Sequence, residues 1–182
     1  MLGYTAEGAN ILLATGAKPQ TLDWIPHGYH ESVFRREPNA RKDLEFDIDE
    51  ATVLVTTVMT NQPRKDWGTW AQTAALLRTL NPERRYRFHI HTDHLDLNWS
   101  LPNLILDFGL RDCAEITTSL TDRQLSQLYS ASNLVFLPSL GEGFGYSLME
   151  ALACGTPFLH QSGGAGGLYW SEIFPTGCAE YD

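Results

Sequence analysis

The sequence predicts an α/β fold in which helices cover both faces of a doubly wound parallel sheet. Continuous apolar and β-branched runs, typical of strands buried on both faces, alternate along the chain with helical segments. This alternation places successive strands in parallel, joined by right-handed crossovers. A glycine-rich turn joins one strand to a helix within residues 138–157, at what would be the carboxyl edge of the sheet.

Length and composition indicate one globular domain. The chain has 182 residues, of which 43% are hydrophobic and 19% charged. These values are ordinary for an α/β protein that is large enough to bury a core. The net charge of −9 argues against a nucleic-acid partner, because binding to a nucleic-acid backbone needs a basic surface.

Three features bear on location. No apolar run approaches membrane-spanning length, and the N-terminus lacks the charged and apolar segments of a signal peptide. The three cysteines, Cys113, Cys154 and Cys178, show no spacing typical of a metal site or a disulfide framework. We therefore expect reduced thiols, no transmembrane segment and a cytoplasmic location.

Residues 1–50 are predicted to be a linker and lead-in segment before a core of residues 51–182. Residues 4–15 favour a helix, and residues 21–25 favour a short strand. Residues 37–50 are polar and charged, which predicts a surface loop.

The core is predicted to contain alternating strands and helices. Strands are expected over residues 51–58, 85–92, 113–118, 133–138, 158–160 and 177–181. Asp66 can cap a helix that reaches about Leu80, and Thr121 can open a capping box for another. Residues 100–109 fit either a helix or a strand, and we favour a helix because Ser100 can cap it and Gly109 can end it.

The stretch of residues 138–157, PSLGEGFGYSLMEALACGTP, is the candidate binding site. Its turn leads into a helix, so that free backbone N–H groups and the positive helix end point at an anion. Glu142 lies in the turn and Glu150 about two turns into the helix. Carboxylates accept hydrogen bonds from hydroxyls, and a nucleotide sugar offers both phosphates and hydroxyls. The alternative is an ordinary helix that follows a tight glycine turn.

This string closely resembles the E-x7-E signature of retaining glycosyltransferases with two Rossmann-like lobes, the GT-B fold of the glycosyltransferase family 4 group (glycosyl transferases group 1). The resemblance covers about residues 20–180 and implies a single lobe, the C-terminal donor-binding one. It implies that Glu142 contacts the transferred sugar and that Glu150 holds the ribose. The amides that it implies for the diphosphate are those of Gly143, Phe144 and Gly145. It implies no cofactor besides the nucleotide-sugar substrate, and no metal.

Arg64 and Lys65 lie between a predicted strand and helix, where a cation can reach a ligand at the carboxyl edge of the sheet. Solvated surface charges are the alternative. The string NQPRKDW is similar to the family's RK motif, which implies that Lys65 contacts the donor phosphates and acts in catalysis with Glu142. The family usually carries an Arg several positions earlier, where this chain has Met59 and Thr60. Either the diphosphate binds more weakly, or Arg64 substitutes, or catalysis has been lost.

Three more residues are candidates. The run WIPHGYHESVF resembles the family's segment between the lobes, so Gly28 is either a backbone position beside the ligand or a turn glycine. Residues 163–167 resemble a turn that approaches the sugar or its phosphates, which makes Gly164 a candidate, with a hinge as the equal alternative. His91 shares a strand face with His89, and we expect His91 to face the ligand cleft.

Two patterns could be taken for metal sites. Asp47 and Asp49 have the D-x-D form that other glycosyltransferases use to hold a divalent metal. They lie in a run of charges, however, and no further ligand completes a tetrahedron around His89 and His91. We therefore assign no metal ligands.

The sequence thus favours a glycosyltransferase donor-binding domain that moves a sugar from a nucleotide sugar to an acceptor hydroxyl with retention. The alternative is a module or subunit that binds the nucleotide sugar but catalyses nothing alone. A third hypothesis is a different Rossmann-type enzyme, such as a sugar-nucleotide epimerase. The family's acceptor-binding first lobe is not in this sequence, so we expect either a piece of a longer protein or a partner chain that supplies the lobe.

Overall fold

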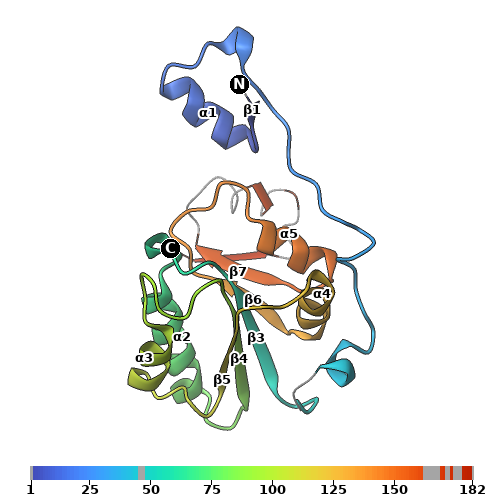
Figure 1. The fold of residues 1–182 in the computed structure, drawn as a ribbon, viewed down its shortest axis with the longest axis vertical. Coiled ribbons are helices and arrows are strands. Elements are labelled where there is room, and N and C mark those ends of the chain that lie inside the picture. Colours follow the sequence, from blue (N-terminus) through green and yellow to red (C-terminus); the bar gives the residue numbers. More distant parts are fainter. Residues whose placement is uncertain (1, 45–47, 162–168, 171–172, 174–177, 182) are drawn as a thin grey trace.

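The computed structural model describes residues 2–44, 48–161, 169–170, 173 and 178–181. Its core is a parallel sheet with the strand order β5-β4-β3-β6-β7-β8 (Figure 1). The strands are β3 (Val53–Val58), β4 (Tyr86–His91), β5 (Ala114–Thr117), β6 (Leu134–Leu137), β7 (Phe158–Gln161) and β8 (Cys178–Tyr181). Four helices of the described core have defined bounds: α2 (Trp67–Leu80), α3 (Leu101–Asp107), α4 (Asp122–Ala131) and α5 (Tyr146–Ala153).

The strand order reverses between β3 and β6. The chain builds outward from β3 through β4 to β5 and then returns to place β6 on the other side of β3. The loops that leave the carboxyl ends of β3 and β6 therefore begin side by side at this point of the sheet edge. In open α/β sheets this switch point is where ligands bind.

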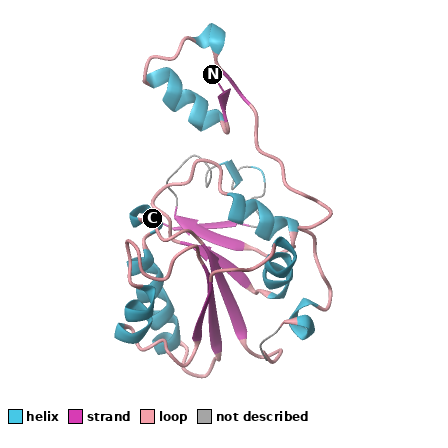
Figure 2. Ribbon diagram, in the orientation of Figure 1, coloured by secondary structure: helices cyan, strands magenta, loops and turns pink. Residues whose placement is uncertain are grey.

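Helices form a layer on each side of the sheet. Figures 1 and 2 show α2 and α3 on one side and α4 and α5 on the other. On the first side Trp67 and Trp70 of α2 are fully buried, and Trp70 packs edge-on against Phe88 of β4. The buried residues of α2 recur at helical spacing, as in an amphipathic helix.

Capping residues fix where the helices begin and end. The side chain of Asp66 accepts a hydrogen bond from the N–H of Thr69, and Thr121 and Gln124 form the predicted capping box. Helix α5 ends in a Schellman motif, in which Gly155 has φ +78°. Residues 101–107 are helical as favoured, although the side chain of Ser100 makes no capping hydrogen bond.

Part of the predicted loop at residues 37–50 packs against the core. It contains a short 3₁₀ turn, η2 (Ala40–Asp43), and Ala40 is only 2% exposed. The guanidinium of Arg41 donates to the carbonyl oxygens of Ala131 and Thr52, at 3.0 and 3.1 Å. This charged side chain therefore holds the segment against the core, where a solvated surface loop was expected.

The N-terminal residues form a separate βαβ unit, which comprises β1 (Leu2–Gly3), α1 (Ala6–Ala14) and β2 (Asp23–Trp24). Strands β1 and β2 pair in parallel with each other and with no strand of the core sheet that the structure describes. Figure 1 shows this unit beyond the end of the sheet that carries α5. The helix and β2 were predicted, whereas the two residues of β1 are too few to show a periodic pattern.

Candidate functional site

Two loops meet where the strand order reverses. One follows β3 and contains the 3₁₀ turn η3 (Pro63–Lys65), and the other follows β6 and leads into α5. The N–H of Leu140 donates to the carbonyl oxygen of Arg64 at 2.8 Å, and Ser147 Oγ donates to the carbonyl oxygen of Val58 at 2.9 Å. These bonds position the predicted cations of one loop against the predicted acid of the other.

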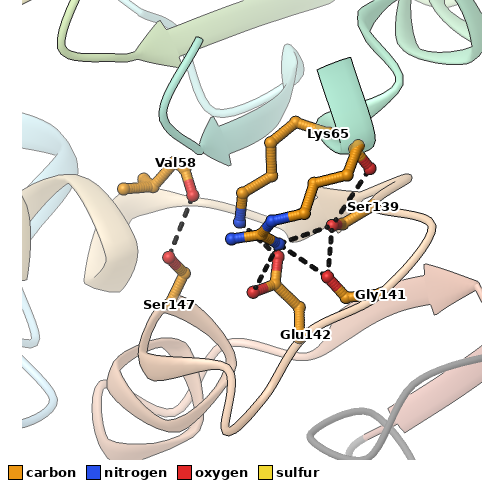
Figure 3. A network of polar contacts seen from close by, with 7 residues as sticks. Val58, Lys65, Ser139, Gly141, Glu142 and Ser147 are labelled. Carbon is orange, nitrogen blue, oxygen red and sulfur yellow. Dashed lines mark hydrogen bonds and ion pairs between the residues drawn. The ribbon is translucent and has the colours of Figure 1, made fainter. Parts of the chain in front are cut away.

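Lys65 and Glu142 form an ion pair between the loops, in which Nζ donates to Oε1 (Figure 3). Nη1 of Arg64 lies 3.3 Å from Oε2 of Glu142 and donates to the carbonyl oxygen of Gly141 at 2.6 Å. One carboxylate thus contacts both cations of the RK pair. The structure brings these three residues together, although Lys65 and Glu142 are 77 positions apart in the sequence.

The ion pair is largely shielded from solvent. The side chain of Lys65 is 10% exposed and that of Glu142 is 18% exposed, compared with 48% for Arg64. Burial lowers the pKa of Lys65, and the attraction to Glu142 opposes this shift. Burial favours a higher pKa for Glu142, but the charge and hydrogen bond of Lys65 outweigh it, so the pKa of Glu142 lies below its usual range. Glu142 is therefore ionised at neutral pH.

The glycine turn leaves the start of α5 open. Gly145 is the N-cap residue, has φ +82°, and would place a Cβ 2.9 Å from Cδ1 of Leu148, so only glycine fits here without strain. Within the described part of the chain, the N–H groups of residues 143–147 donate to no partner. These N–H groups and the positive end of the helix dipole together form a site suited to an anion.

A cavity of about 430 Å³ covers this junction. Its lining residues are Tyr4, His27, Val58, Met59, Thr60, Lys65, Leu137, Glu142, Gly143, Phe144, Gly145, Tyr146, Ser147 and Leu148. Charged groups therefore lie beside the open amides, while aromatic and aliphatic side chains supply much of the remaining wall. This combination suits a small ligand that carries both an anionic group and a larger, less polar part.

The aromatic part of the wall was not predicted. The ring of His27 lies 3.9 Å from that of Tyr4, and 5.1 and 5.0 Å from those of Phe144 and Tyr146. Tyr4 and His27 belong to the N-terminal segment, and they bring it against the glycine turn. The available signal was the position of His27, directly before Gly28 in the segment compared with the family's connection between lobes.

Glu150 is held apart from the ion pair. Its Oε2 accepts a hydrogen bond from the hydroxyl of Tyr129 at 3.1 Å, and Glu150 does not line the cavity. Burial raises the pKa of Glu150 to about 7, although the hydrogen bond from Tyr129 opposes this shift and the nearby Asp122 adds to it. Glu150 is thus a carboxyl group that titrates near neutral pH, one to two helical turns from the junction.

The other predicted candidates are not all gathered here. His91 and His89 do share a face, and both bond to the hydroxyl of Thr117, at 3.1 and 3.0 Å, but His91 does not line the cavity. Gly28 does not line it either, in contrast to its neighbour His27. Gly164 lies outside the described residues.

Neither metal pattern forms a cluster in the part of the chain that the structure covers. Asp49 instead pairs with Arg85 at 2.6 Å and accepts bonds from Thr52, while Asp47 lies outside the described residues. No group of three or more His, Cys, Asp or Glu side chains is placed to hold a metal ion among the described residues. None of the described helices is long and apolar enough to cross a membrane.

A larger cavity, of about 880 Å³, lies at the amino edge of the sheet. Four arginines line it, namely Arg78, Arg84, Arg85 and Arg87. Asp112 pairs with Arg78 at 2.7 Å. The carboxyl ends of α2 and α3 lie at the wall, which includes Thr79 of α2 and Phe108, the C-cap residue of α3. Carboxyl ends of helices carry partial negative charge, which disfavours an anion. The open amides therefore make the smaller cavity the better candidate.

Comparison with known proteins agrees with this fold. Residues 96–166 match the family described as "Glycosyl transferases group 1". The D-inositol 3-phosphate glycosyltransferase of Gordonia bronchialis is 30% identical over 159 residues, which cover 84% of this chain and 35% of the relative. The chain thus spans about a third of the length of this curated relative.

Two solved structures share the fold. The match with sucrose-phosphate synthase from Thermosynechococcus elongatus covers 98% of this chain and 44% of the synthase chain, with a TM-score of 0.82 and 23% sequence identity. Alr3699/HepE from Anabaena, in complex with UDP and glucose, matches 92% of this chain and 45% of its own, with a TM-score of 0.76 and 18% identity. The predicted α/β fold of a GT-B lobe is confirmed.

Proposed function

Because residues 96–166 match the glycosyl transferases group 1 family and the named relative is a glycosyltransferase, we propose that this chain is the donor-binding lobe of a glycosyltransferase. The donor is a nucleotide sugar, and the sugar passes to an acceptor hydroxyl with retention at the anomeric carbon. The observation that carries the proposal is the open junction at residues 143–147, whose amides lie beside Lys65 in a cavity at the switch point of the sheet.

The diphosphate of the donor binds at this junction. The amides of Gly143, Phe144 and Gly145 donate to its oxygens, and Lys65 supplies positive charge. Negative charge on the leaving diphosphate grows as the bond to the sugar breaks. Fixed donors and a buried cation stabilise that charge without having to reorganise, so they favour the transition state over the bound substrate.

Arg64 is the second cation of the site. Met59 and Thr60 stand where the family usually carries an Arg, and both line the cavity without supplying a charge. Met59 is 3% exposed. Arg64 contacts Glu142 and the glycine turn instead, and its side chain is half-exposed. We propose that it approaches the diphosphate from the solvent side and partly replaces the missing Arg.

The two acids of the signature bind hydroxyl groups. Glu142 lines the cavity and accepts from hydroxyls of the transferred sugar, while Glu150 accepts from the ribose. Tyr129 fixes the Glu150 carboxylate through its hydroxyl, which leaves the other carboxylate oxygen for the ligand. The nucleobase, the sugar and the acceptor are chosen by contacts beyond these residues.

The acceptor side belongs to another lobe, in the same protein or in a partner chain. The βαβ unit of residues 2–25 supports this proposal, because its two-stranded parallel sheet is too small to be stable alone. Its residues expose large apolar side chains, among them Leu2, Ile11 and Ile25. Further strands and helices alongside β1 and β2 would cover these residues.

Calorimetric titration of the purified chain tests the proposal, with UDP, GDP, UDP-glucose and GDP-mannose as probes. We expect binding of at least one nucleotide and its sugar derivative. Lys65→Ala should weaken that binding by about 1–3 kcal/mol, because a buried cation contact to phosphate is lost. Lys18→Ala is the matched control, since Lys18 is exposed and does not line the cavity.

Two results would contradict the proposal: no binding of any of the four probes, or equal affinity of the wild type and Lys65→Ala. Release of free sugar from a bound donor, or transfer to an added acceptor, would show that the chain is catalytic by itself. Tight binding without turnover would identify a binding module that needs its second lobe.

A further inference from the structure

Two residues that we assign to different parts of the donor are bonded to each other in the structure. Lys65, which we assign to the diphosphate, donates its Nζ to Glu142, which we assign to the sugar. Both side chains are more than four-fifths buried. A diphosphate that takes Lys65 therefore has to take it from a buried carboxylate.

The loss of Lys65 leaves Glu142 poorly compensated. Within the described chain, the other cation beside Glu142 is Arg64, which lies 3.3 Å away and is half-exposed, so its charge is partly screened by solvent. A bare nucleoside diphosphate also brings its own negative charge close to this carboxylate. A buried carboxylate that loses its partner is destabilised strongly, and like charges add to the penalty.

A nucleotide sugar avoids this penalty. Its diphosphate can accept from Lys65 while its sugar hydroxyls donate to the oxygens of Glu142 that Lys65 has left. The exchange leaves each buried charge with a hydrogen-bonding partner. A nucleoside diphosphate satisfies only Lys65, because it lacks the hydroxyls that would reach Glu142.

We infer that the Lys65–Glu142 pair determines specificity: it makes the site prefer the nucleotide sugar to the nucleoside diphosphate that remains after transfer. This inference rests on the proposed function. When the sugar departs, Glu142 loses its hydroxyl donors and competes again for Lys65, which promotes release of the diphosphate. The pair thus opposes product inhibition.

The test compares the affinities of the wild type and Glu142→Gln for a nucleoside diphosphate and for its sugar derivative, UDP with UDP-glucose and GDP with GDP-mannose. Glutamine keeps the shape of the side chain and removes its charge. We expect the variant to bind the nucleoside diphosphate roughly tenfold more tightly, because a like charge is removed from a partly buried site. Binding of the nucleotide sugar should not improve, so the preference for it should fall by at least the same factor.

Asp107→Asn is the matched control for total charge, since Asp107 is exposed on α3 and does not line the cavity. It should leave both affinities unchanged. Glu142→Ala serves as a second variant, and it should also bind the nucleoside diphosphate more tightly. Thermal unfolding of each variant verifies that it folds.

The outcomes separate the two levels of the proposal. If the wild type binds none of the probes, the proposed function fails, and the inference fails with it. If the wild type binds a nucleoside diphosphate but Glu142→Gln and Glu142→Ala bind it no more tightly, the inference is overturned while the proposed function stands. Tighter binding by both variants, with a reduced preference for the nucleotide sugar, supports the inference.

Discussion

At the scale of single residues, identical side chains have different properties because their neighbours differ. Glu142 contacts two cations, which hold its pKa below the usual range, whereas burial beside Tyr129 raises the pKa of Glu150 to about 7. The two acids of one signature therefore differ in charge near neutral pH. Spacing alone predicted both as ionised hydrogen-bond acceptors and could not reveal this difference.

Glu150 should make stability depend on pH. Its pKa is about 7 in the folded chain, compared with 4.5 for an unperturbed Glu, the value taken for the unfolded chain. Between pH 4.5 and 7 the folded chain therefore binds more protons than the unfolded chain. Stability should then fall as the pH rises from 5 to 8. Glu150→Gln keeps a hydrogen-bond acceptor for Tyr129 and cannot ionise. Between pH 5 and 8, the free energy of unfolding of this variant should fall by on the order of 1–3 kcal/mol less than that of the wild type. Urea unfolding at both pH values measures this difference.

Glu83→Gln is the control for the pH measurement, because Glu83 is exposed on the loop before β4. Its stability should follow that of the wild type at both pH values. If Glu150→Gln also follows the wild type, Glu150 does not hold a raised pKa in the folded chain.

At the scale of elements, short-range signals located the helices well. Asp66 and Thr121 begin α2 and α4 as predicted, because a side-chain cap depends only on residues within one turn. Ser100 was chosen by the same rule for α3, yet its side chain makes no capping bond. A residue type that favours the N-cap position therefore predicts where a helix begins more reliably than it predicts a capping hydrogen bond from that side chain.

These two N-cap positions form a matched pair for mutation. Thr121→Ala should destabilise the chain by about 1 kcal/mol, because the hydroxyl of Thr121 no longer accepts from the N–H of Gln124 or donates to its Oε1. Ser100→Ala should change the free energy of unfolding by less than about 0.5 kcal/mol, because no capping bond is lost. Urea unfolding measures both values, and equal effects would contradict the assigned cap geometry.

The open start of α5 depends on the backbone of Gly145. Gly145→Ala adds a Cβ to a residue with φ +82° and forces it against Leu148, so we expect destabilisation of about 1–3 kcal/mol. Gly141→Ala, in the same turn, meets no atom within 4 Å and should change stability by less than about 0.5 kcal/mol. A comparable loss in both variants would show that the turn tolerates no side chain, whatever its φ.

At the scale of the whole molecule, the sequence predicted the fold because strand and helix patterns are local. Strands β3 to β8 and helices α2 to α5 begin within about two residues of their predicted positions, and the parallel order follows from their alternation. The glycine turn and the RK pair were found for a related reason. Each is a short segment whose residue types are tied to backbone geometry or to charge.

The sequence could not show contacts between distant segments. The pairing of Lys65 with Glu142 and the packing of Tyr4 and His27 over the turn join parts of the chain that only folding brings together. His91 was expected to face the ligand cleft. The alternation of side chains along a strand shows which face of the sheet a residue occupies, but it does not show which residues of other strands or loops lie beside it. Its partner is Thr117 on the adjacent strand.

The central claim is that the junction at residues 143–147 binds the diphosphate of a nucleotide sugar. The most direct measurement is an amide NMR titration of the chain with UDP and with GDP. We expect the N–H signals of Gly143, Phe144 and Gly145 to shift most, with those of Gly109 and Arg87 at the amino edge of the sheet unchanged. Shifts confined to the amino edge, or saturation without any change at residues 143–147, would contradict the account.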